Sequence, residues 1–221
     1  MDSREIEKIT GVSPGCEEIY RRAFVHRSAH ENSNERLEFV GDAVLGAIVA
    51  AYLYERYPNE DEGFLTRTRT NIVSSKGLHK IAEQIGIHNH VVMNERGMSK
   101  GWNKNKKVLE DALEALVGAV FIDKGYDSAK RFVEGLIETH VRFSDATRDT
   151  NYKDILAKAA QSRKLGDVVF DVTCTSGPDH QRWYTVQACI KHHKLSKGSG
   201  STKKDAEQIA AYRVLKSMGL M

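Results

Sequence analysis

Cysteine, proline and long apolar runs are all scarce in this sequence. The chain has 221 residues, with three cysteines and three prolines. Cys16, Cys174 and Cys189 are odd in number and lack the C-x-x-C spacing of a zinc site, which predicts reduced thiols in an intracellular protein. The longest apolar run, residues 43–54, has about a dozen residues, whereas a membrane-spanning helix needs about twenty. The charged start, MDSREIEKIT, lacks the apolar core of a signal peptide. We therefore expect a cytoplasmic protein without a membrane anchor.

A large excess of charge of one sign is also missing, since 33 basic residues face 30 acidic ones. The composition, 40% hydrophobic and 29% charged, is typical of a soluble globular protein and excludes disordered, collagen-like and fibrous classes. The small net charge of +3 conceals an asymmetry. Residues 1–148 carry 21 basic and 23 acidic side chains, a net charge of −2, whereas residues 149–221 carry 12 and 7, a net charge of +5. A basic C-terminal part favours a phosphate-rich partner for that part alone.

The spacing of apolar residues divides the chain into two domains. Up to about residue 143, apolar residues recur every three or four positions, which predicts an all-helical fold. The candidate helices are 16–24, 34–57, 63–74, 75–85, 107–124 and 128–143. The polar stretch DATRDT at 145–150 indicates a linker. We therefore expect domains at 1–144 and 151–221, joined by a linker at 145–150.

The second domain has a different pattern. Residues 151–161 are predicted to form a short helix, and residues 168–174 and 182–190 alternate with the period of two that is typical of strands. A third strand near 193–197 and a helix over 202–218 complete the order α-β-β-β-α. This order predicts a small α+β module.

Acidic residues stand at helical spacing in the first domain. Glu35, Glu38 and Asp42 stand at i, i+3 and i+7 of one predicted helix, and Asp111 and Glu114 at i and i+3 of another. This spacing places the carboxylates of each helix on one face, where like charges repel. If the two helices pack together, they bring together four carboxylates, those of Glu38, Asp42, Asp111 and Glu114. Only a cation would make such a cluster of like charges tolerable. Oxygen-only ligands suit Mg2+ or Mn2+ and indicate phosphoryl transfer or phosphodiester hydrolysis.

Two other interpretations compete for these acids. An ordinary solvated helix face is the simpler one, because runs of charge usually lie at the surface. A di-iron bundle would need Glu-x-x-His motifs, but Gly41 and Val117 occupy the positions where the histidines would stand.

Lysines gather at the start of the last predicted helix. Lys203 and Lys204 follow the stretch GSGST directly. The N-terminus of a helix presents free N–H groups and the positive end of the helix dipole, so lysines placed there can clamp a phosphate. A merely solvated helix start is the alternative.

Several stretches of the first domain closely resemble the ribonuclease III family. They are HRS at 26–28, NERLEFVGDA at 34–43, EGFLT at 62–66 and DALEAL at 111–116, in the family's order. The resemblance implies an all-α N-terminal endonuclease domain in which Glu38, Asp42, Asp111 and Glu114 hold Mg2+, with Mn2+ possible. That metal would activate water against a phosphodiester of double-stranded RNA, leaving 5′-phosphate and 3′-hydroxyl ends. By the same resemblance, two further acids, Glu35 and Glu62, support the reaction. One aromatic side chain, that of Phe39, enters the partner subunit of a homodimer. A place in the core of its own subunit is the alternative for the aromatic residue.

The second domain resembles the double-stranded RNA-binding domain. The resemblance rests on GSGSTKKDAEQIAA at 198–211 and GPDH at 177–180. It implies that Lys203 and Lys204 span phosphates across the major groove, and that Gln161 and His180 touch the flanking minor grooves. Ala157 stands where relatives often carry a polar residue that contacts RNA.

The chain departs from the nuclease pattern just before Asp111. Lys106, Lys107 and Glu110 stand where many relatives carry small and apolar residues. Glu110 could shift the metal affinity or face solvent, and the sequence leaves both open.

We therefore expect a Mg2+-dependent endoribonuclease that cleaves double-stranded RNA to short duplexes, in RNA processing or degradation. One alternative is a protein that sequesters duplex RNA, such as a silencing suppressor, with a vestigial nuclease. A hydrolase of small phosphate esters would explain the acids but not the basic module.

Overall fold

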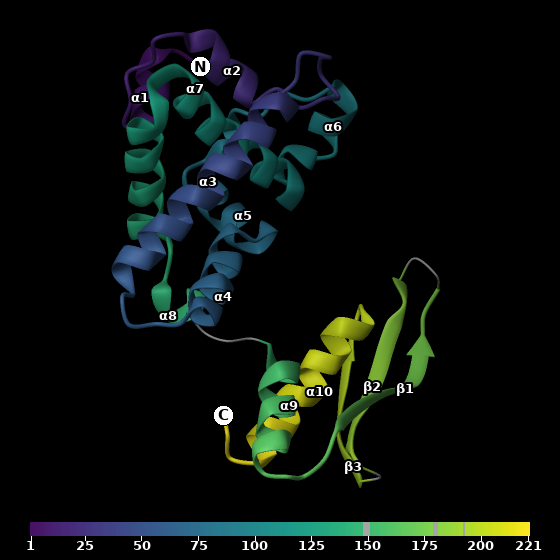
Figure 1. The fold of residues 1–221 in the computed structure, drawn as a ribbon. Helices are drawn as coiled ribbons and strands as arrows, with labels where there is room; N and C mark the ends of the chain where they lie inside the picture. The colour runs from purple at the N-terminus through teal and green to yellow at the C-terminus, as the bar shows by residue number, and fades with distance from the viewer. Residues whose placement is uncertain (148–150, 179–180, 192) are drawn as a thin grey trace. The chain divides into compact units, whose positions relative to one another are not determined.

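The chain folds into two compact units, Met1–Arg148 and Asp149–Met221 (Figure 1). The computed structural model describes residues 1–147, 151–178, 181–191 and 193–221. The first unit is helical and the second combines three strands with two helices, which confirms the predicted fold class.

The helical unit contains eight α-helices and two short 3-10 helices within the described residues. The α-helices are α1 (Ser3–Thr10), α2 (Glu17–Ala23), α3 (Glu35–Arg56), α4 (Glu62–Val73), α5 (Ser75–Gln84), α6 (Glu95–Ser99), α7 (Lys106–His140) and α8 (Phe143–Ala146). The 3-10 helices are η1 (Ile87–Asn89) and η2 (Trp102–Lys104). The sequence prediction lacked α1, α6 and α8, and α8 includes Asp145 and Ala146, which the prediction assigned to the linker.

Helix α7 joins two segments that the sequence pattern separates. The prediction placed one helix over 107–124 and another over 128–143, with a break at Gly125. Gly125 does leave the helical conformation, with φ of 77°, a backbone angle that suits glycine. The helical segments continue on either side of this kink, so the break bends the helix without separating its halves by a loop.

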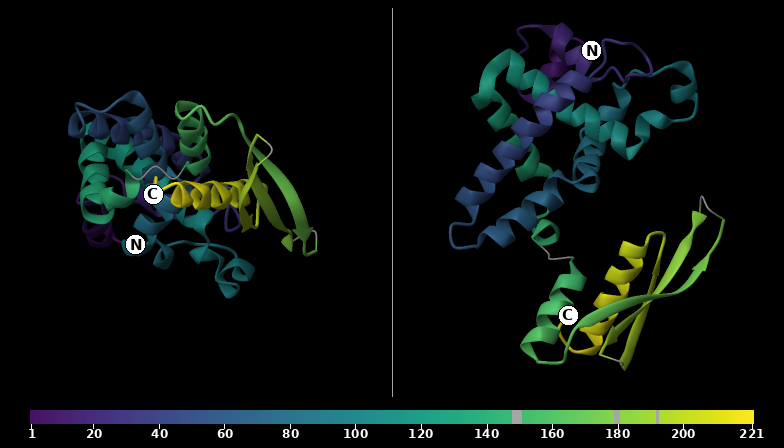
Figure 2. Two further views of the ribbon diagram at one scale, coloured as in Figure 1. Left: turned by 90° about the horizontal axis from the view of Figure 1, so that it is seen from below. Right: turned by 45° about the vertical axis from the view of Figure 1, so that its right-hand side comes forward.

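Helices α3 and α7 cross in direct backbone contact, as Figure 2 also shows from other sides. A Cβ atom added at Gly41 would lie 1.7 Å from the carbonyl oxygen of Glu114, and one added at Gly118 would lie 2.2 Å from the carbonyl oxygen of Leu37. Only glycine permits so close an approach. Because Glu38 stands one turn before Gly41, the crossing brings Glu38 and Glu114 to the same place.

Helix α3 is the one helix in the described residues that is long and apolar enough to cross a membrane by length and composition. Its inner face contributes Leu45, Ile48, Val49 and Leu53 to the hydrophobic core, where they join buried residues of α7. Helix α3 therefore meets this test while one of its faces packs inside the helical unit.

The second unit has the element order α9 (Tyr152–Ser162), β1 (Val168–Ser176), β2 (Trp183–Ile190), β3 (His193–Gly200) and α10 (Lys203–Ser217). The strands form one antiparallel sheet in the order β1-β2-β3, with Phe170 opposite Ala188 and Val186 opposite Gly198. Both helices lie on one side of the sheet (Figure 2). Their small core consists of Leu156, Ala188, Ala210, Ala211, Val214 and Leu215.

A side-chain cap fixes the beginning of α10. The hydroxyl of Thr202 accepts a hydrogen bond from the backbone N–H of Asp205 at 3.1 Å and donates one to the Asp205 carboxylate at 2.8 Å. This cap agrees with the spacing of Thr202 and Asp205 in the sequence. It places Lys203 and Lys204 in the first turn of the helix.

Candidate active site and nucleic-acid interface

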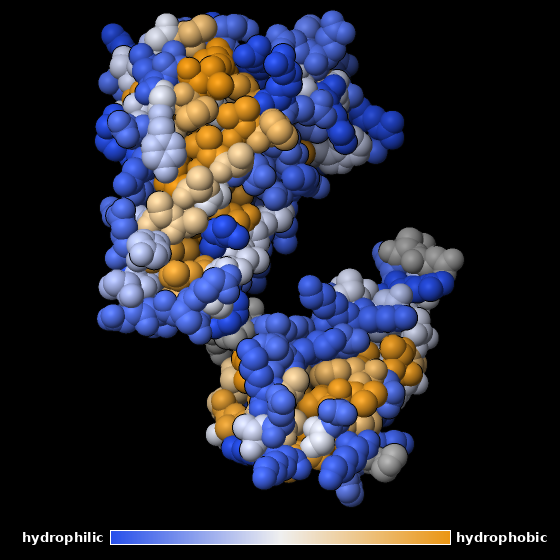
Figure 3. Space-filling model, viewed as in Figure 1, coloured by the Kyte–Doolittle hydropathy of each residue, from blue (hydrophilic) through white to orange (hydrophobic). Residues whose placement is uncertain are grey.

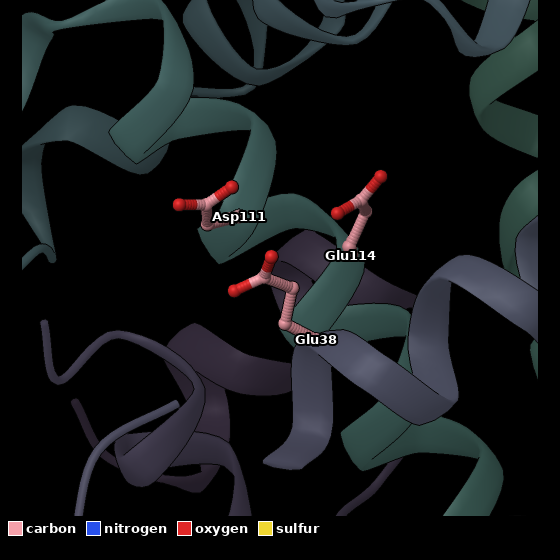
Figure 4. A group of neighbouring side chains, drawn as sticks. All are labelled: Glu38, Asp111 and Glu114. Carbon is pink, nitrogen blue, oxygen red and sulfur yellow. The ribbon is translucent and has the colours of Figure 1, made fainter. Parts of the chain in front are cut away.

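Three carboxylates converge at the crossing of α3 and α7. Glu38 comes from the first turn of α3, and Asp111 and Glu114 come from the first half of α7. One oxygen of each lies within 4.8 Å of an oxygen of the other two. Figure 4 shows the three side chains extending from two helices into one space. We refer to these three residues as the carboxylate cluster.

Burial makes the carboxylate cluster electrostatically unfavourable when all its members are charged. Glu114 is only 6% exposed. Desolvation, assisted by the charges of Asp42 and Glu110, raises the pKa of the Glu114 carboxyl to about 8. Desolvation also raises the pKa of Glu38, with repulsion from Asp111 second, and raises the pKa of Asp111. Added positive charge would therefore stabilise the ionised form of the cluster.

A divalent cation fits this donor set. Three carboxylates from two rigid helices supply oxygen ligands only, which Mg2+ and Mn2+ prefer. The cation would satisfy Glu114, whose buried charge has no ion-pair partner within 4 Å among the described residues. The residues present thus match a metal site better than a solvated helix face.

Lys107 is a neighbour of the carboxylate cluster that the sequence prediction did not assign to it. Its Nζ lies 2.7 Å from Oδ1 of Asp111, 3.8 Å from Oε1 of Glu38 and 3.8 Å from Oε2 of Glu110. The spacing of Lys107 and Asp111, i and i+4, is a signal that could have indicated the pair. The side chain of Glu110 is only 13% exposed, so Glu110 faces the site and not the solvent.

The three other predicted acids lie outside the carboxylate cluster. Asp42 is exposed, although its charge acts on Glu114. Glu35 is exposed and pairs with Arg27 at 3.5 Å. Glu62 lies at the start of α4 and accepts a hydrogen bond from the Thr66 hydroxyl at 2.7 Å. The structure therefore brings together three of the six predicted acids and places a fourth, Asp42, close enough to repel Glu114.

Phe39, next to Glu38, points away from the core. It is 81% exposed, which excludes its placement in the core of its own subunit. Farther along α3, Tyr54 is 74% exposed, and Ala43 and Ala47 between them are accessible as well. Figure 3 shows apolar surface gathered along this helix. Helix α3 thus has an inner apolar face that packs on α7 and an outer one that contacts solvent.

The first turn of α10 presents positive charge at the surface. Lys203 and Lys204 are exposed, and no carboxylate lies within ion-pair distance of either in the part of the chain that the structure describes. The nearby Lys153, by contrast, pairs with Glu207. Gln161 and Ala157 are exposed on α9, whereas His180 lies outside the described residues. Helix α10 can therefore offer two lysines and its free N–H groups to a phosphate backbone.

Comparison with known proteins gives the same division into two parts. A family model described as Ribonuclease-III-like matches residues 17–141, and one described as double-stranded RNA binding motif matches residues 152–218. A Ribonuclease 3 of Chlorobium chlorochromatii is 35% identical over 215 residues, which cover 93% of this chain and 86% of that protein. A protein of Paramecium bursaria Chlorella virus 1, A464R, is 39% identical over 218 residues, 98% of this chain and 79% of that protein.

Solved structures agree with this result for the helical unit. The crystal structure of the nuclease domain of ribonuclease III from Campylobacter jejuni matches with a TM-score of 0.59 and 30% identity, over 63% of this chain and 97% of that one. The fold and the carboxylate cluster define a nuclease unit followed by a double-stranded RNA-binding module. The chain belongs to the ribonuclease III family, whose members depend on a divalent metal. It is an endoribonuclease specific for double-stranded RNA.

Proposed function

We propose that the protein cleaves double-stranded RNA with Mg2+ held by Glu38, Asp111 and Glu114, and with Asp42 as a fourth acid beside Glu114. The observation that carries this proposal is the convergence of three carboxylates from α3 and α7 within 4.8 Å. Mn2+ has the same oxygen preference and would substitute. When bound, the metal would supply an activated water that attacks the phosphodiester and leaves 5′-phosphate and 3′-hydroxyl ends.

The chain's own residues hold and orient the reacting groups. Glu114 and Asp111 stand one turn apart on the same rigid helix, and Glu38 reaches them from α3, so the ligands are held in place before RNA binds. Asp42 is exposed, where it can accept a hydrogen bond from water or from substrate. Glu35 and Glu62 keep a supporting role in the proposal, at positions outside the carboxylate cluster.

The C-terminal module, residues 151–221, would bind the duplex by its shape. The deep major groove of an A-form helix hides its base edges, so phosphates and 2′-hydroxyls carry the recognition. Lys203 and Lys204 would contact phosphates across the major groove, and Gln161 and His180 the flanking minor grooves. The exposure of both lysines, without carboxylate partners in the described residues, supports this assignment.

Two subunits would act together as a homodimer. Phe39, exposed beside Glu38, would insert into the partner, and the outer apolar face of α3 would be covered. A solved nuclease domain of ribonuclease III from Campylobacter jejuni is described as structurally flexible in a region involved in dimer formation. A large exposed apolar surface of this kind is typical of an interface.

The remaining parts of the proposal concern domain limits and location. We place the nuclease domain at 1–144, the linker at 145–150 and the RNA-binding domain at 151–221. The three cysteines of the chain are free, which supports a reducing compartment such as the cytoplasm.

The test is incubation of long double-stranded RNA with the full chain, with and without Mg2+. We expect Mg2+-dependent cleavage to short duplexes with 5′-phosphate and 3′-hydroxyl ends, and loss of cleavage in Asp111→Asn. Asp127→Asn is a matched control, because Asp127 is an exposed acid on the same helix. Binding without cleavage by the wild-type protein would favour the sequestering alternative, and 5′-hydroxyl products would contradict the mechanism.

A further inference from the structure

Lys107 introduces a positive charge into the carboxylate cluster from within the chain. It stands in the first turn of α7, one turn before Asp111. Its ammonium lies 2.7 Å from Oδ1 of Asp111 and 3.8 Å from Oε1 of Glu38, two members of the cluster. Glu110, directly before Asp111, lies 3.8 Å from the same ammonium.

The ammonium occupies the side of the cluster that a metal ion would also use. A divalent cation held by Glu38, Asp111 and Glu114 would need oxygens of both Asp111 and Glu38. The ammonium already pairs with those two carboxylates. A cation bound to the same carboxylates would lie close to the ammonium, and the two positive charges would repel each other. Among the residues that the structure describes, Glu114 forms no ion pair, so Lys107 does not neutralise the most buried acid of the cluster.

We propose that Lys107 is a tethered counter-ion that competes with the divalent cation for Asp111 and Glu38 and so weakens metal binding. The inference rests on the proposed function, because it concerns the same metal site. Without metal, Lys107 offsets part of the repulsion among the acids. When metal binds, the ammonium moves away from Asp111 into solvent.

The exposure of Lys107 makes this exchange easy. Its side chain is 63% exposed, so the ammonium keeps much of its hydration and its ion pairs are weak. A lysine stem is long and flexible, and the charged end can reach water without movement of α7. The lysine thus reduces the metal affinity without blocking the site.

Glu110 adds another negative charge beside Lys107, 3.8 Å from its ammonium. Its carboxylate is largely buried, and its charge raises the pKa of Glu114 together with desolvation and Asp42. Lys107 and Glu110 are both departures from the small and apolar pattern expected before Asp111. They place two opposite charges 3.8 Å apart beside the cluster.

The experiment measures binding of Mn2+ to the RNA-free full chain by electron paramagnetic resonance of the free ion. Lys107→Met keeps much of the aliphatic stem and removes the charge, and we expect it to tighten Mn2+ binding about three- to tenfold. Lys107→Arg keeps the charge and should stay near the wild-type affinity. Lys106→Met is the matched control, since Lys106 is exposed and has no ion pair among the described residues. Circular dichroism checks that each variant is folded.

Activity provides a second measurement. Lys107→Met should reach half-maximal cleavage at a lower Mg2+ concentration than the wild type and Lys106→Met. Unchanged or weaker Mn2+ binding in folded Lys107→Met would overturn the inference.

A Glu114→Gln arm separates this inference from the proposed function. If Glu114→Gln lowers Mn2+ affinity and Lys107→Met leaves it unchanged, the metal site is supported and only the role of Lys107 is wrong. If Glu114→Gln leaves Mn2+ binding unchanged, or the wild type binds no Mn2+, the proposed site and the inference are both wrong.

Discussion

The acids of the nuclease unit and the lysines of the RNA-binding module lie in opposite surroundings. Glu114 is buried among like charges at a helix crossing, whereas Lys203 and Lys204 are exposed at the start of α10. Burial makes the ionised form of Glu114 unfavourable unless a metal binds. Exposure leaves the positive charges of Lys203 and Lys204 accessible to a phosphate backbone. Cleavage should therefore depend on packing inside the first unit, and binding on charge at the surface of the second.

The largest expected effect is a loss of RNA cleavage without a loss of RNA binding. Glu114→Gln should reduce cleavage of duplex RNA at least about a hundredfold, because even groups that only support metal ligands contribute 10- to 100-fold. Binding of duplex RNA in Ca2+ should remain unchanged, as measured by filter binding. A comparable loss of binding would contradict the assignment of cleavage to the first unit and of binding to the second.

The same variant should be more stable than the wild type in the absence of metal. Because burial raises the pKa of Glu114 to about 8, folding near neutral pH must either protonate this carboxyl or bury its charge, and glutamine avoids that cost, which we expect to stabilise the protein by about 1 kcal/mol. Thermal unfolding in EDTA measures the effect, with Asp127→Asn as the control. A lower midpoint for Glu114→Gln would contradict the electrostatic account of the cluster.

Gly41→Ala tests whether the site depends on the helix crossing. A Cβ at Gly41 would lie 1.7 Å from the Glu114 carbonyl oxygen, so α3 and α7 must separate. We expect a loss of about 3 kcal/mol in unfolding free energy and a loss of cleavage, measured by urea unfolding and RNA digestion.

Gly46→Ala is the matched control on the same helix. A Cβ at Gly46 would meet no atom within 4 Å, so the change should be neutral or stabilising by up to about 1 kcal/mol. Equal effects of the two variants would show that close packing at Gly41 is not what holds the carboxylates.

Phe39→Ala tests the outer face of α3. Because Phe39 is exposed, the monomer should keep its stability, while the dimer should weaken by about 2 kcal/mol, typical of an aromatic interface residue. Sedimentation over a concentration series measures the dimer. Trp102→Ala, an exposed aromatic outside α3, should leave dimerisation unchanged.

The lysines of α10 test the surface charge of the second unit. Lys203→Ala with Lys204→Ala should weaken duplex binding about tenfold and reduce the slope of log affinity against log salt by about two. Lys216→Ala, at the other end of the same helix, should leave both unchanged. An unchanged slope in the double variant would exclude these lysines as phosphate contacts.

Local spacing predicted much of this protein. The three-and-four periodicity of the first unit and the alternation in the second are encoded within a few residues, so they predicted helices and strands without knowledge of packing. The motif around Glu38 and the one around Asp111 indicated the family for the same reason. The prediction was less successful at α1, α6 and α8, which are short helices, and at Gly125, where α7 bends without ending in a loop.

The arrangement of the acids shows where local spacing stops being informative. Glu35, Glu38 and Asp42 share one helical face by spacing, but the crossing at Gly41 selects Glu38 for the carboxylate cluster and leaves Asp42 exposed. Whether Phe39 lies in the core or at the surface also depended on where α7 packs.

The sequence by itself determined the two domains, the acidic and basic halves of the chain and the residue types suited to a metal and to phosphate. Only the tertiary structure decided which acids meet, that Glu110 faces the site and that Lys107 lies beside Asp111. The physical reason is that helical spacing relates residues on one helix, whereas distances between helices depend on how closely their backbones pack. Here that distance is set by two glycines, Gly41 and Gly118, at the crossing of α3 and α7.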